Sequence, residues 1–348
     1  MESVYVLEPG SYLRKEGGSL NVVRNGSVAD RIPAGGLKRL MLVGYVSLSG
    51  PVLDYLIQNR VETVFITPTG RFRARLGLDE HKHVSLRKSQ YLHLDRKDFA
   101  LQTAGVIVRG KISNMYRLLL LRARQYQEEA VKIAAVKLKS LAAATQGIDD
   151  LDKLRGMEGA AAREYFKAFA YLIRNKSFTF NGRNRRPPRD PVNALLSFVY
   201  TLLTNEVLSA IKAAGLDPYL GALHDIAYGR PSLACDLVEE YRAFMGDRLV
   251  LGLINRKVIG PADFVFRKDP PKAFIDEAEM KANRPVEMKP AVCRAFIAAY
   301  EQMMNRSISY PPLAKKVTYR WLILNQVRRF GQYLENPAKV YKPFAWEN

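Results

Sequence analysis

The hydrophobic pattern of the chain changes period once, and this change limits the possible folds more than any other feature. Up to about residue 85, short runs of β-branched and aromatic residues alternate with turns, as at 4–7, 20–23 and 61–66. From about Phe99 onward, apolar residues recur at helical spacing over long Leu- and Ala-rich stretches. Strands followed by helices are typical of an α+β protein. We therefore expect a β-rich domain over residues 1–85, a linker over 86–98 and a larger all-helical domain over 99–348.

Three local signals support this division. Asn25-Gly26 lies between two short apolar runs, which favours a two-residue β-hairpin turn. The segment Pro51–Ile57 has the composition of one short helix between strands. Asp190-Pro191 pairs an N-cap residue with a first-turn proline, and apolar residues follow at helical spacing from Leu195.

The charge of the chain restricts its partners. The sequence has 54 Lys and Arg against 34 Asp and Glu, a formal net charge of +20. A surplus of this size favours polyanions, because neutralising phosphates releases condensed counterions. Nucleic acid is the natural candidate, and an anionic membrane surface is the competing one. We find no uninterrupted apolar stretch near the roughly 18–20 residues that a spanning helix needs, and the start does not resemble a secretory signal.

Cysteine usage agrees with a cytoplasmic, soluble protein. Cys235 and Cys293 are the two cysteines of the sequence, so neither a disulfide framework nor a four-cysteine zinc site can form. The sequence also lacks G-x-x-x-x-G-K-[ST] and G-x-G-x-x-G, so nucleotide hydrolysis and dinucleotide binding have no support.

One histidine and two acids form the main candidate site. Gly229 and Pro231 precede an apolar-periodic run that places Asp236 and Glu239 on one helix, three residues apart and pointing the same way. A histidine delivered from the preceding loop, His224, could close a mixed nitrogen and oxygen site that favours Mg²⁺ or Mn²⁺. The alternative is a solvated acidic helix face with an incidental histidine.

Two arginine-rich segments could contact DNA. Residues 71–76 alternate charge with apolar side chains, so a strand there would project its arginines from one face while Phe72, Ala74 and Leu76 pack inward. The alternative is an edge strand that carries cations to discourage pairing. Residues 181–190 form a proline-containing loop that suits phosphate binding, with a solvated linker as the alternative. The candidate DNA-binding residues are Arg71, Arg73, Arg75, Arg183, Arg185, Arg186 and Arg189.

Four motifs together carry a family resemblance. They are Gly156–Ala162 (GMEGAAA), Arg183–Ser197, Gly215–His224 and Gly229–Arg242. In this order, between a β-rich start and a helical remainder, they resemble the CRISPR-associated integrase-nuclease family of the spacer-acquisition module. Each motif alone is weak, and the combination is specific.

The resemblance implies a role for each site residue. Glu158, His224 and Glu239 look like the metal ligands, and Asp236 looks like an accompanying acid near the metal or its bound water. All four are then candidate catalytic residues. Glu158 has another explanation, because a carboxylate is favourable in a first helical turn without any metal. Asn193 is interpreted as structural, bonding the metal-bearing helix.

The resemblance also implies a reaction and partners. A Mg²⁺ or Mn²⁺ ion at this site would activate water for cleavage or a DNA 3′-OH for strand transfer. The family inserts short captured DNA duplexes into a CRISPR array by staggered attacks on repeat phosphodiesters. The expected partners are double-stranded and branched DNA, a second copy of the chain contacted through the β-rich domain, and a small ferredoxin-like protein. The alternatives are a non-catalytic nucleic-acid-binding scaffold and, less favoured, a hydrolase of small phosphate esters.

Overall fold

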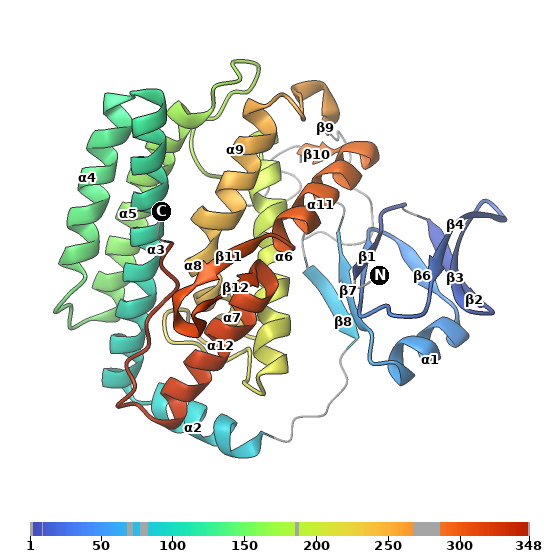
Figure 1. Ribbon diagram of the computed structural model, residues 1–348, viewed down its shortest axis with the longest axis horizontal. Helices are drawn as coiled ribbons and strands as arrows, with labels where there is room; N and C mark the ends of the chain where they lie inside the picture. The colour runs from blue at the N-terminus through green and yellow to red at the C-terminus, as the bar shows by residue number, and fades with distance from the viewer. Residues whose placement is uncertain are drawn as a thin grey trace. The chain divides into compact units, whose positions relative to one another are not determined.

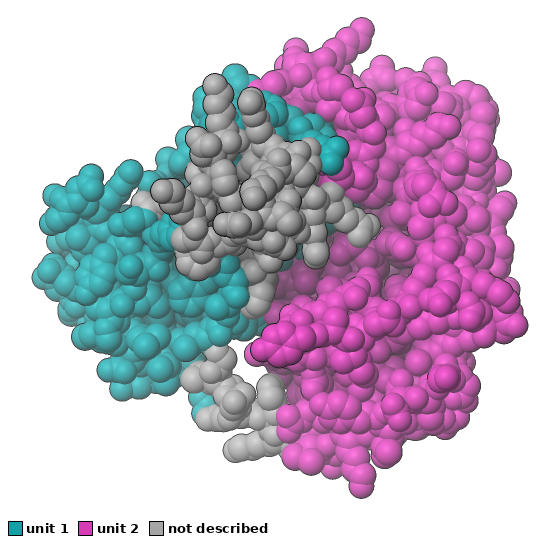
Figure 2. Space-filling model, turned by 180° about the vertical axis from the view of Figure 1, so that it is seen from behind, with its two compact units in different colours: residues 1–80, 186–201, 262–297 teal, residues 81–185, 202–261, 298–348 magenta. Residues whose placement is uncertain are grey.

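The chain divides into two compact units, which Figure 2 distinguishes by colour. This computed structural model describes residues 3–8, 10–67, 72–76, 83–184, 188–266 and 286–346. The first unit comprises Met1–Glu80, Arg186–Thr201 and Ala262–Ile297. The second comprises His81–Arg185, Leu202–Pro261 and Ala298–Asn348.

Two four-stranded sheets form the N-terminal part of the first unit (Figure 1). One has the order β1-β5-β7-β8, in which β1, β5 and β7 are parallel and β8 is antiparallel. The other has the order β4-β3-β2-β6. The strands are β1 (Ser3–Val6), β2 (Ser11–Glu16), β3 (Ser19–Arg24), β4 (Ser27–Pro33), β5 (Arg39–Val43), β6 (Val46–Leu48), β7 (Glu62–Ile66) and β8 (Phe72–Leu76).

The local signals of this region are confirmed. Arg24 pairs with Ser27 across Asn25 and Gly26, whose φ angles are 48° and 78°. Two consecutive positive φ angles are those of a type I′ turn, the tight turn that matches strand twist. The short helix is α1 (Gly50–Gln58), and it buries Val52 and Leu56 in one apolar core with residues of both sheets.

Long helices dominate the second unit. They begin with α2 (Val84–Leu94), α3 (Lys97–Tyr126), α4 (Glu129–Ala144) and α5 (Leu151–Leu172). Figure 1 shows α3, α4 and α5 side by side, and each packs against the other two. Gln127, in a left-handed conformation with φ of 53°, ends α3 and separates it from α4. Residues 86–98, expected to be a linker, include most of α2 and the start of α3.

Helix α6 (Pro191–Ala213) begins at the predicted cap. The Asp190 carboxylate accepts the Asn193 N–H at 2.8 Å, and the Asn193 amide donates to the same carboxylate at 2.6 Å. Asn193 therefore reinforces the cap of its own helix, and the expected bond from Asn193 to the metal-bearing helix stays a prediction. Helix α6 is also long and apolar enough to cross a membrane, but 72% of its most apolar window is buried inside the protein. A core helix has the same composition, so this length and apolarity need no membrane.

The chain continues through a bent series of helical segments. They are α7 (Ser232–Leu237), α8 (Glu239–Tyr241), the π-helix η1 (Arg242–Asp247) and α9 (Arg248–Asn255). The helix predicted across Asp236 and Glu239 is divided into α7 and α8, which meet at Val238 in right-handed helical conformation. The hydrogen-bonding pattern changes between them, at Val238, and shifts to π-helical spacing from Arg242. Such π-helical segments are frequent at functional sites.

The last part of the chain combines short strands with two helices. The 3₁₀ turns are η2 (Pro261–Asp263) and η3 (Pro311–Leu313), and the helices are α11 (Pro290–Met304) and α12 (Tyr319–Glu335). β9 (Phe264–Phe266) pairs with β10 (Val286–Met288), and β11 (Ser307–Tyr310) with β12 (Lys315–Thr318). The α+β class, strands first and helices after, is confirmed. These two hairpins are exceptions to the all-helical expectation for residues 99–348.

The C-terminal segment is buried although it is not helical. Tyr341, Phe344 and Trp346 are each less than a tenth exposed. The buried Asn114 amide on α3 donates to the carbonyls of Glu240 and Phe344, at 2.9 and 2.8 Å. Asn114 thus connects the segment to both α3 and α8.

Candidate metal centre

The loop before α7 wraps around the carboxylate of Asp236. The Oδ2 atom of Asp236 accepts the main-chain N–H groups of Ala222 and Leu223 at 2.6 and 2.9 Å. Its Oδ1 atom accepts the N–H of His224 at 3.1 Å and lies 2.5 Å from the Nδ1 atom of the same histidine. Asp236 is fully buried. Because both oxygens are engaged within the protein, Asp236 orients the histidine.

The orientation of His224 is the one that a metal-binding histidine needs. A ligating imidazole commonly donates its other ring nitrogen to a carboxylate, which fixes the tautomer and the ring plane. Since Nδ1 faces Asp236, the Nε2 atom is the one left to bind a ligand. The side chain of His224 is 26% exposed, so it is partly accessible from solvent. The prediction that a loop delivers His224 is confirmed.

Gly221 permits the tight wrapping of this loop. A Cβ atom at this position would lie 2.8 Å from the backbone carbon of Ser232 and would also collide with the Asp236 carboxylate. Real Cβ contacts are not this short, so a side chain here would push the loop away from α7. The glycine allows the two segments to approach closely.

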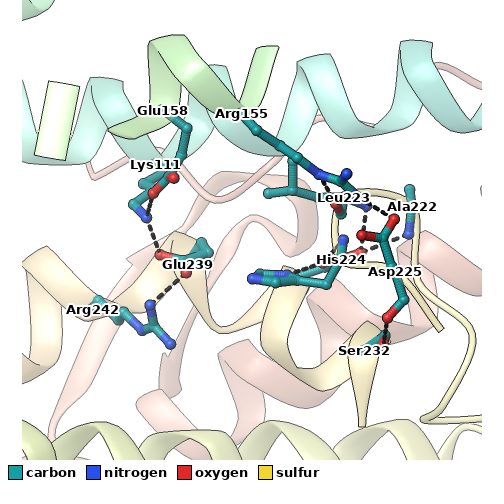
Figure 3. Close-up of polar contacts among 11 residues, drawn as sticks. Lys111, Arg155, Glu158, Ala222, Leu223, His224, Asp225, Ser232, Glu239 and Arg242 are labelled. Atoms are coloured by element: carbon teal, nitrogen blue, oxygen red, sulfur yellow. Dashed lines mark hydrogen bonds and ion pairs between the residues drawn. The ribbon is translucent and has the colours of Figure 1, made fainter. Parts of the chain in front are cut away.

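Arg155 ties the histidine loop to α5. Its guanidinium donates from Nε and Nη2 to the Leu223 carbonyl at 3.0 and 2.8 Å, and Nη2 also pairs with Asp225. Arg155 thus holds the residue on each side of His224, as Figure 3 shows. Glu158 follows Arg155 by three residues on the same helix. One face of α5 therefore carries both Glu158 and the arginine that anchors the His224 loop.

Two carboxylates converge on one buried ammonium group. The Nζ atom of Lys111, on α3, donates to Oε1 of Glu158 and lies 2.8 Å from Oε2 of Glu239 (Figure 3). Lys111 is 5% exposed, Glu239 4% and Glu158 24%. Three helices, α3, α5 and α8, therefore contribute to one charged cluster. Glu158 lies in the middle of α5 rather than in its first turn, so the first-turn explanation for this carboxylate is wrong.

Glu239 is ionised despite its burial. Burial raises the pKa of a carboxyl group, but Arg242 and Lys111 outweigh this effect and hold the pKa of Glu239 at about 2. His224 acts in the same direction, and Figure 3 shows its ring extending toward Glu239. Asp236 contacts His224, whereas Glu239 pairs with Lys111 and Arg242, so the predicted site shared by the two acids through His224 stays a prediction.

The donor set suits a hard divalent cation. Two carboxylates already share one cation, and a third ligand, the Nε2 atom of His224, is held in a fixed orientation nearby. Carboxylate oxygens with one imidazole favour Mg²⁺ or Mn²⁺. The Oε2 atom of Glu239 is buried without a hydrogen bond of good geometry, so it has spare acceptor capacity. Across the described ranges, however, no three His, Cys, Asp or Glu side chains lie close enough to form a ready-made metal site.

Lys111 and Arg155 were missed in the sequence analysis. Lys111 does leave a signal, because it interrupts the buried apolar stripe of α3 between Ile107, Val108 and Met115. A lysine inside such a stripe needs a buried counter-charge. The sequence gives no comparable signal for Arg155, which lies on a half-exposed helix face near acidic residues.

The strand arginines do not form the predicted ridge. In β8, the Arg75 side chain is 6% exposed and pairs with Glu62 at 3.1 Å, while Ala74, expected to pack inward, is exposed. Arg73 donates to the Gly44 carbonyl and lies over the ring of Tyr45. The neighbouring strand supplies Glu62, which draws Arg75 inward. Arg71, Arg185 and Arg186 lie outside the described residues, and Arg183 and Arg189 lie in non-helical segments as predicted.

A groove of about 490 Å³ runs along α5 from Glu158. Arg163, Lys167 and Arg183 line it together with two aromatic side chains, Phe166 and Phe180. Arg163 and Lys167 are exposed and form no ion pair with any described residue. A groove with uncompensated cations beside a carboxylate cluster is suited to an anionic ligand such as a phosphate backbone.

The protein thus combines a β-rich region with a helical region, and the helical region carries a carboxylate cluster whose Glu158 also lines a basic groove. The sequence matches the family described as CRISPR associated protein Cas1 over residues 4–283, and the chain belongs to this family. A relative from Chlorobaculum tepidum named CRISPR-associated endonuclease Cas1 1 is 37% identical over 99% of this chain and 98% of its own length.

Two solved structures share the fold. A chain of a Cas6-RT-Cas1–Cas2 complex has a TM-score of 0.82 and 22% identity, over 99% of this chain and 36% of the other. A casposase bound to an integration product has a TM-score of 0.82 and 22% identity, over 100% of this chain and 95% of the other.

Proposed function

We propose that this protein is a divalent-metal-dependent DNA endonuclease and strand-transfer integrase that inserts short captured DNA duplexes into a CRISPR array. The convergence of Glu158 and Glu239 on one cation, beside a histidine held by Asp236, carries the proposal. Membership of the Cas1 family, with a relative named an endonuclease, supports the nuclease activity. The fold shared with a casposase bound to an integration product is in keeping with strand transfer.

Glu158, His224 and Glu239 would hold the Mg²⁺ or Mn²⁺ ion. When bound, such an ion supplies Lewis-acid polarisation of the phosphodiester and activation of the attacking hydroxyl. Asp236 keeps Nδ1 of His224 engaged, so that Nε2 faces the ligand. Arg155 fixes the loop on both sides of His224.

The groove gives the DNA a place beside these residues. Arg163 and Lys167 would contact successive phosphates, since they follow one another by four residues on α5. Arg183 lines the groove as well. Among the other candidate arginines, Arg73 and Arg75 have partners within the protein, so they are weaker candidates for DNA contact.

The same site serves two reactions because the attacking hydroxyl can differ. Attack by water breaks a phosphodiester bond and cleaves the strand. Attack by a DNA 3′-OH on a repeat phosphodiester forms a bond to the incoming strand while the bond to the repeat 3′-oxygen breaks, which releases a 3′-OH on the repeat. Two staggered attacks need two sites at a fixed separation, which a homodimer provides. We propose that residues 1–85 form the dimer contact, that the helical residues 99–348 carry the site, and that dimers assemble in the cytoplasm with a small ferredoxin-like protein. A related chain occurs in a Cas6-RT-Cas1–Cas2 complex, which supports a partner of this kind.

Branched DNA distinguishes this function from a DNA-binding scaffold. The purified protein is incubated with labelled branched DNA in Mg²⁺, in Mn²⁺ and in a chelator. We expect metal-dependent cleavage and strand transfer by the natural chain, their loss in His224→Ala, and nearly unchanged duplex binding in that variant. Lys137→Ala, which removes an exposed ion pair to Glu164 on α5, serves as the control with full activity. DNA binding without any metal-dependent product would favour the scaffold.

A further inference from the structure

Lys111 is the one buried cation that both candidate carboxylate ligands share within the described chain. Its side chain is 5% exposed, and the residues one helical turn away, Ile107, Val108 and Met115, are buried apolar residues of α3. An ammonium group is costly in such surroundings unless it is paired. Its partners are Glu158 and Glu239. The lysine is therefore held at this position by the two carboxylates.

The cluster is electrically balanced without a metal ion. Glu158 and Glu239 contribute two negative charges, and Lys111 and Arg242 contribute two positive charges. A divalent cation bound to the same carboxylates would leave two positive charges in excess, next to an ammonium group. Buried like charges repel strongly because little solvent screens them.

We propose that Lys111 is an internal competitor of the metal ion: it neutralises Glu158 and Glu239 in the metal-free protein and must leave both carboxylates before the ion binds. This rests on the proposed function, because it takes these two residues as ligands. It explains why the described residues hold a charged cluster at this place but no ready-made group of three ligands. Lys111 is in this sense a positioning residue, which holds two carboxylates together until a metal ion replaces it.

The substitution Lys111→Met separates this role from a purely structural one. Methionine keeps the length of the side chain and removes its charge. Removing the competitor should tighten Mn²⁺ binding to the full-length protein by about tenfold or more, a typical size for coupling between two ligands of one site. The same substitution should lower the melting temperature of the metal-free protein, because two carboxylates lose their counter-ion. If Lys111 had only a structural role, the substitution would lower both the Mn²⁺ affinity and the melting temperature.

The measurement is a titration with Mn²⁺, following free Mn²⁺ by electron paramagnetic resonance, and thermal unfolding with and without the metal. Lys111→Gln is measured in parallel as a second test in case Lys111→Met does not fold. Glutamine also removes the charge, but its amide can still donate a hydrogen bond to Glu158. Lys137→Met is the matched control, because it removes an exposed ion pair between Lys137 on α4 and Glu164, which lies on α5 like Glu158. Each measurement is repeated in a protein that also carries Glu239→Gln, so that Mn²⁺ binding at this site can be told from Mn²⁺ binding elsewhere.

Three results are distinguishable. Tighter Mn²⁺ binding in both Lys111 variants that disappears with Glu239→Gln, and no change in Lys137→Met, supports the inference. Binding that depends on Glu239 but is equal or weaker in the Lys111 variants overturns the inference and leaves the proposed metal site intact. The absence of any Glu239-dependent Mn²⁺ binding overturns both.

Discussion

The main-chain N–H and the Nδ1 atom of His224 both face one oxygen of Asp236, at 3.1 and 2.5 Å. The carboxylate therefore fixes the backbone and the ring of the histidine at once. Burial of Asp236 protects these contacts from water, which makes each of them stronger than it would be at the surface.

Replacing Asp236 by Asn should reduce catalysis by about 10- to 100-fold, the usual effect of removing a carboxylate that orients a metal-binding histidine. An amide also offers fewer acceptor sites to the three N–H groups of the loop, which should cost about 1–3 kcal/mol of stability. Strand-transfer rates and urea unfolding measure the two effects. Asp149→Asn, at an exposed surface position, should change neither, and equal catalysis in both variants would refute the role of Asp236.

Arg155→Met should lower the strand-transfer rate by about tenfold and leave duplex affinity unchanged, because it frees the histidine loop from α5 without altering the groove. Limited proteolysis should cut residues 219–230 faster in this variant. Lys153→Met removes an exposed ion pair on the same helix and provides the comparison. If the loop is equally protected in both variants, Arg155 does not anchor it.

Gly221→Ala should destabilise the protein by about 1–3 kcal/mol and abolish most of the activity, because the added Cβ would separate the loop from α7. Gly156→Ala is the opposite case, since nothing lies within 4 Å of a Cβ at that helical position. Alanine there should stabilise α5 by about 0.4–1 kcal/mol. Chemical denaturation of the two variants tests the contrast, and similar destabilisation by both would contradict it.

The double substitution of Arg163 and Lys167 by Ala should weaken DNA binding and reduce its salt dependence. Each lost phosphate contact lowers the slope of log affinity against log salt by about 0.7–0.9. The control is the double substitution of Lys132 and Lys139 by Ala on α4. It removes the same total charge at exposed positions outside the groove. Equal slopes for the two double variants would mean that the groove does not bind DNA.

Glu240 should make stability depend on pH. Burial raises the pKa of this carboxyl from 4.5 to about 7, although Tyr341, Phe344 and Gln326 donate hydrogen bonds to it. The folded protein then holds a proton that the unfolded chain releases, so stability falls as pH rises from about 4.5 to about 7. Between about pH 5 and about pH 8 the natural protein should lose on the order of 2 kcal/mol more than Glu240→Gln. If the natural protein and Glu240→Gln lose the same stability over this pH range, another titrating group is responsible.

Sequence signals were reliable where the cause is local. The turn at Asn25-Gly26 follows from two residues that tolerate positive φ, and the start of α6 follows from a carboxylate placed to accept the first N–H groups. The loop position of His224 follows from the Gly and Pro residues around it. Each of these features depends on neighbours within a few residues.

Features that depend on packing could not be predicted. Lys111 and Glu239 are more than a hundred residues apart, and no local pattern indicates that α3 and α8 bring them together. Arg75 alternates with apolar residues as a surface arginine would, but Glu62 on the neighbouring strand draws it inward. The interruption at Val238 likewise has no Gly or Pro to mark it.

If Glu158 and Glu239 bind the proposed metal ion, their balance by Lys111 and Arg242 would separate the stability of the fold from the supply of metal. Small metallo-domains such as zinc fingers unfold when a chelator removes their ion. Here the charges of the two carboxylates are already compensated, so the fold would not need the ion in order to form. Scarcity of the ion would then suspend its chemistry without exposing it to degradation, and a returning supply would restore activity without new synthesis.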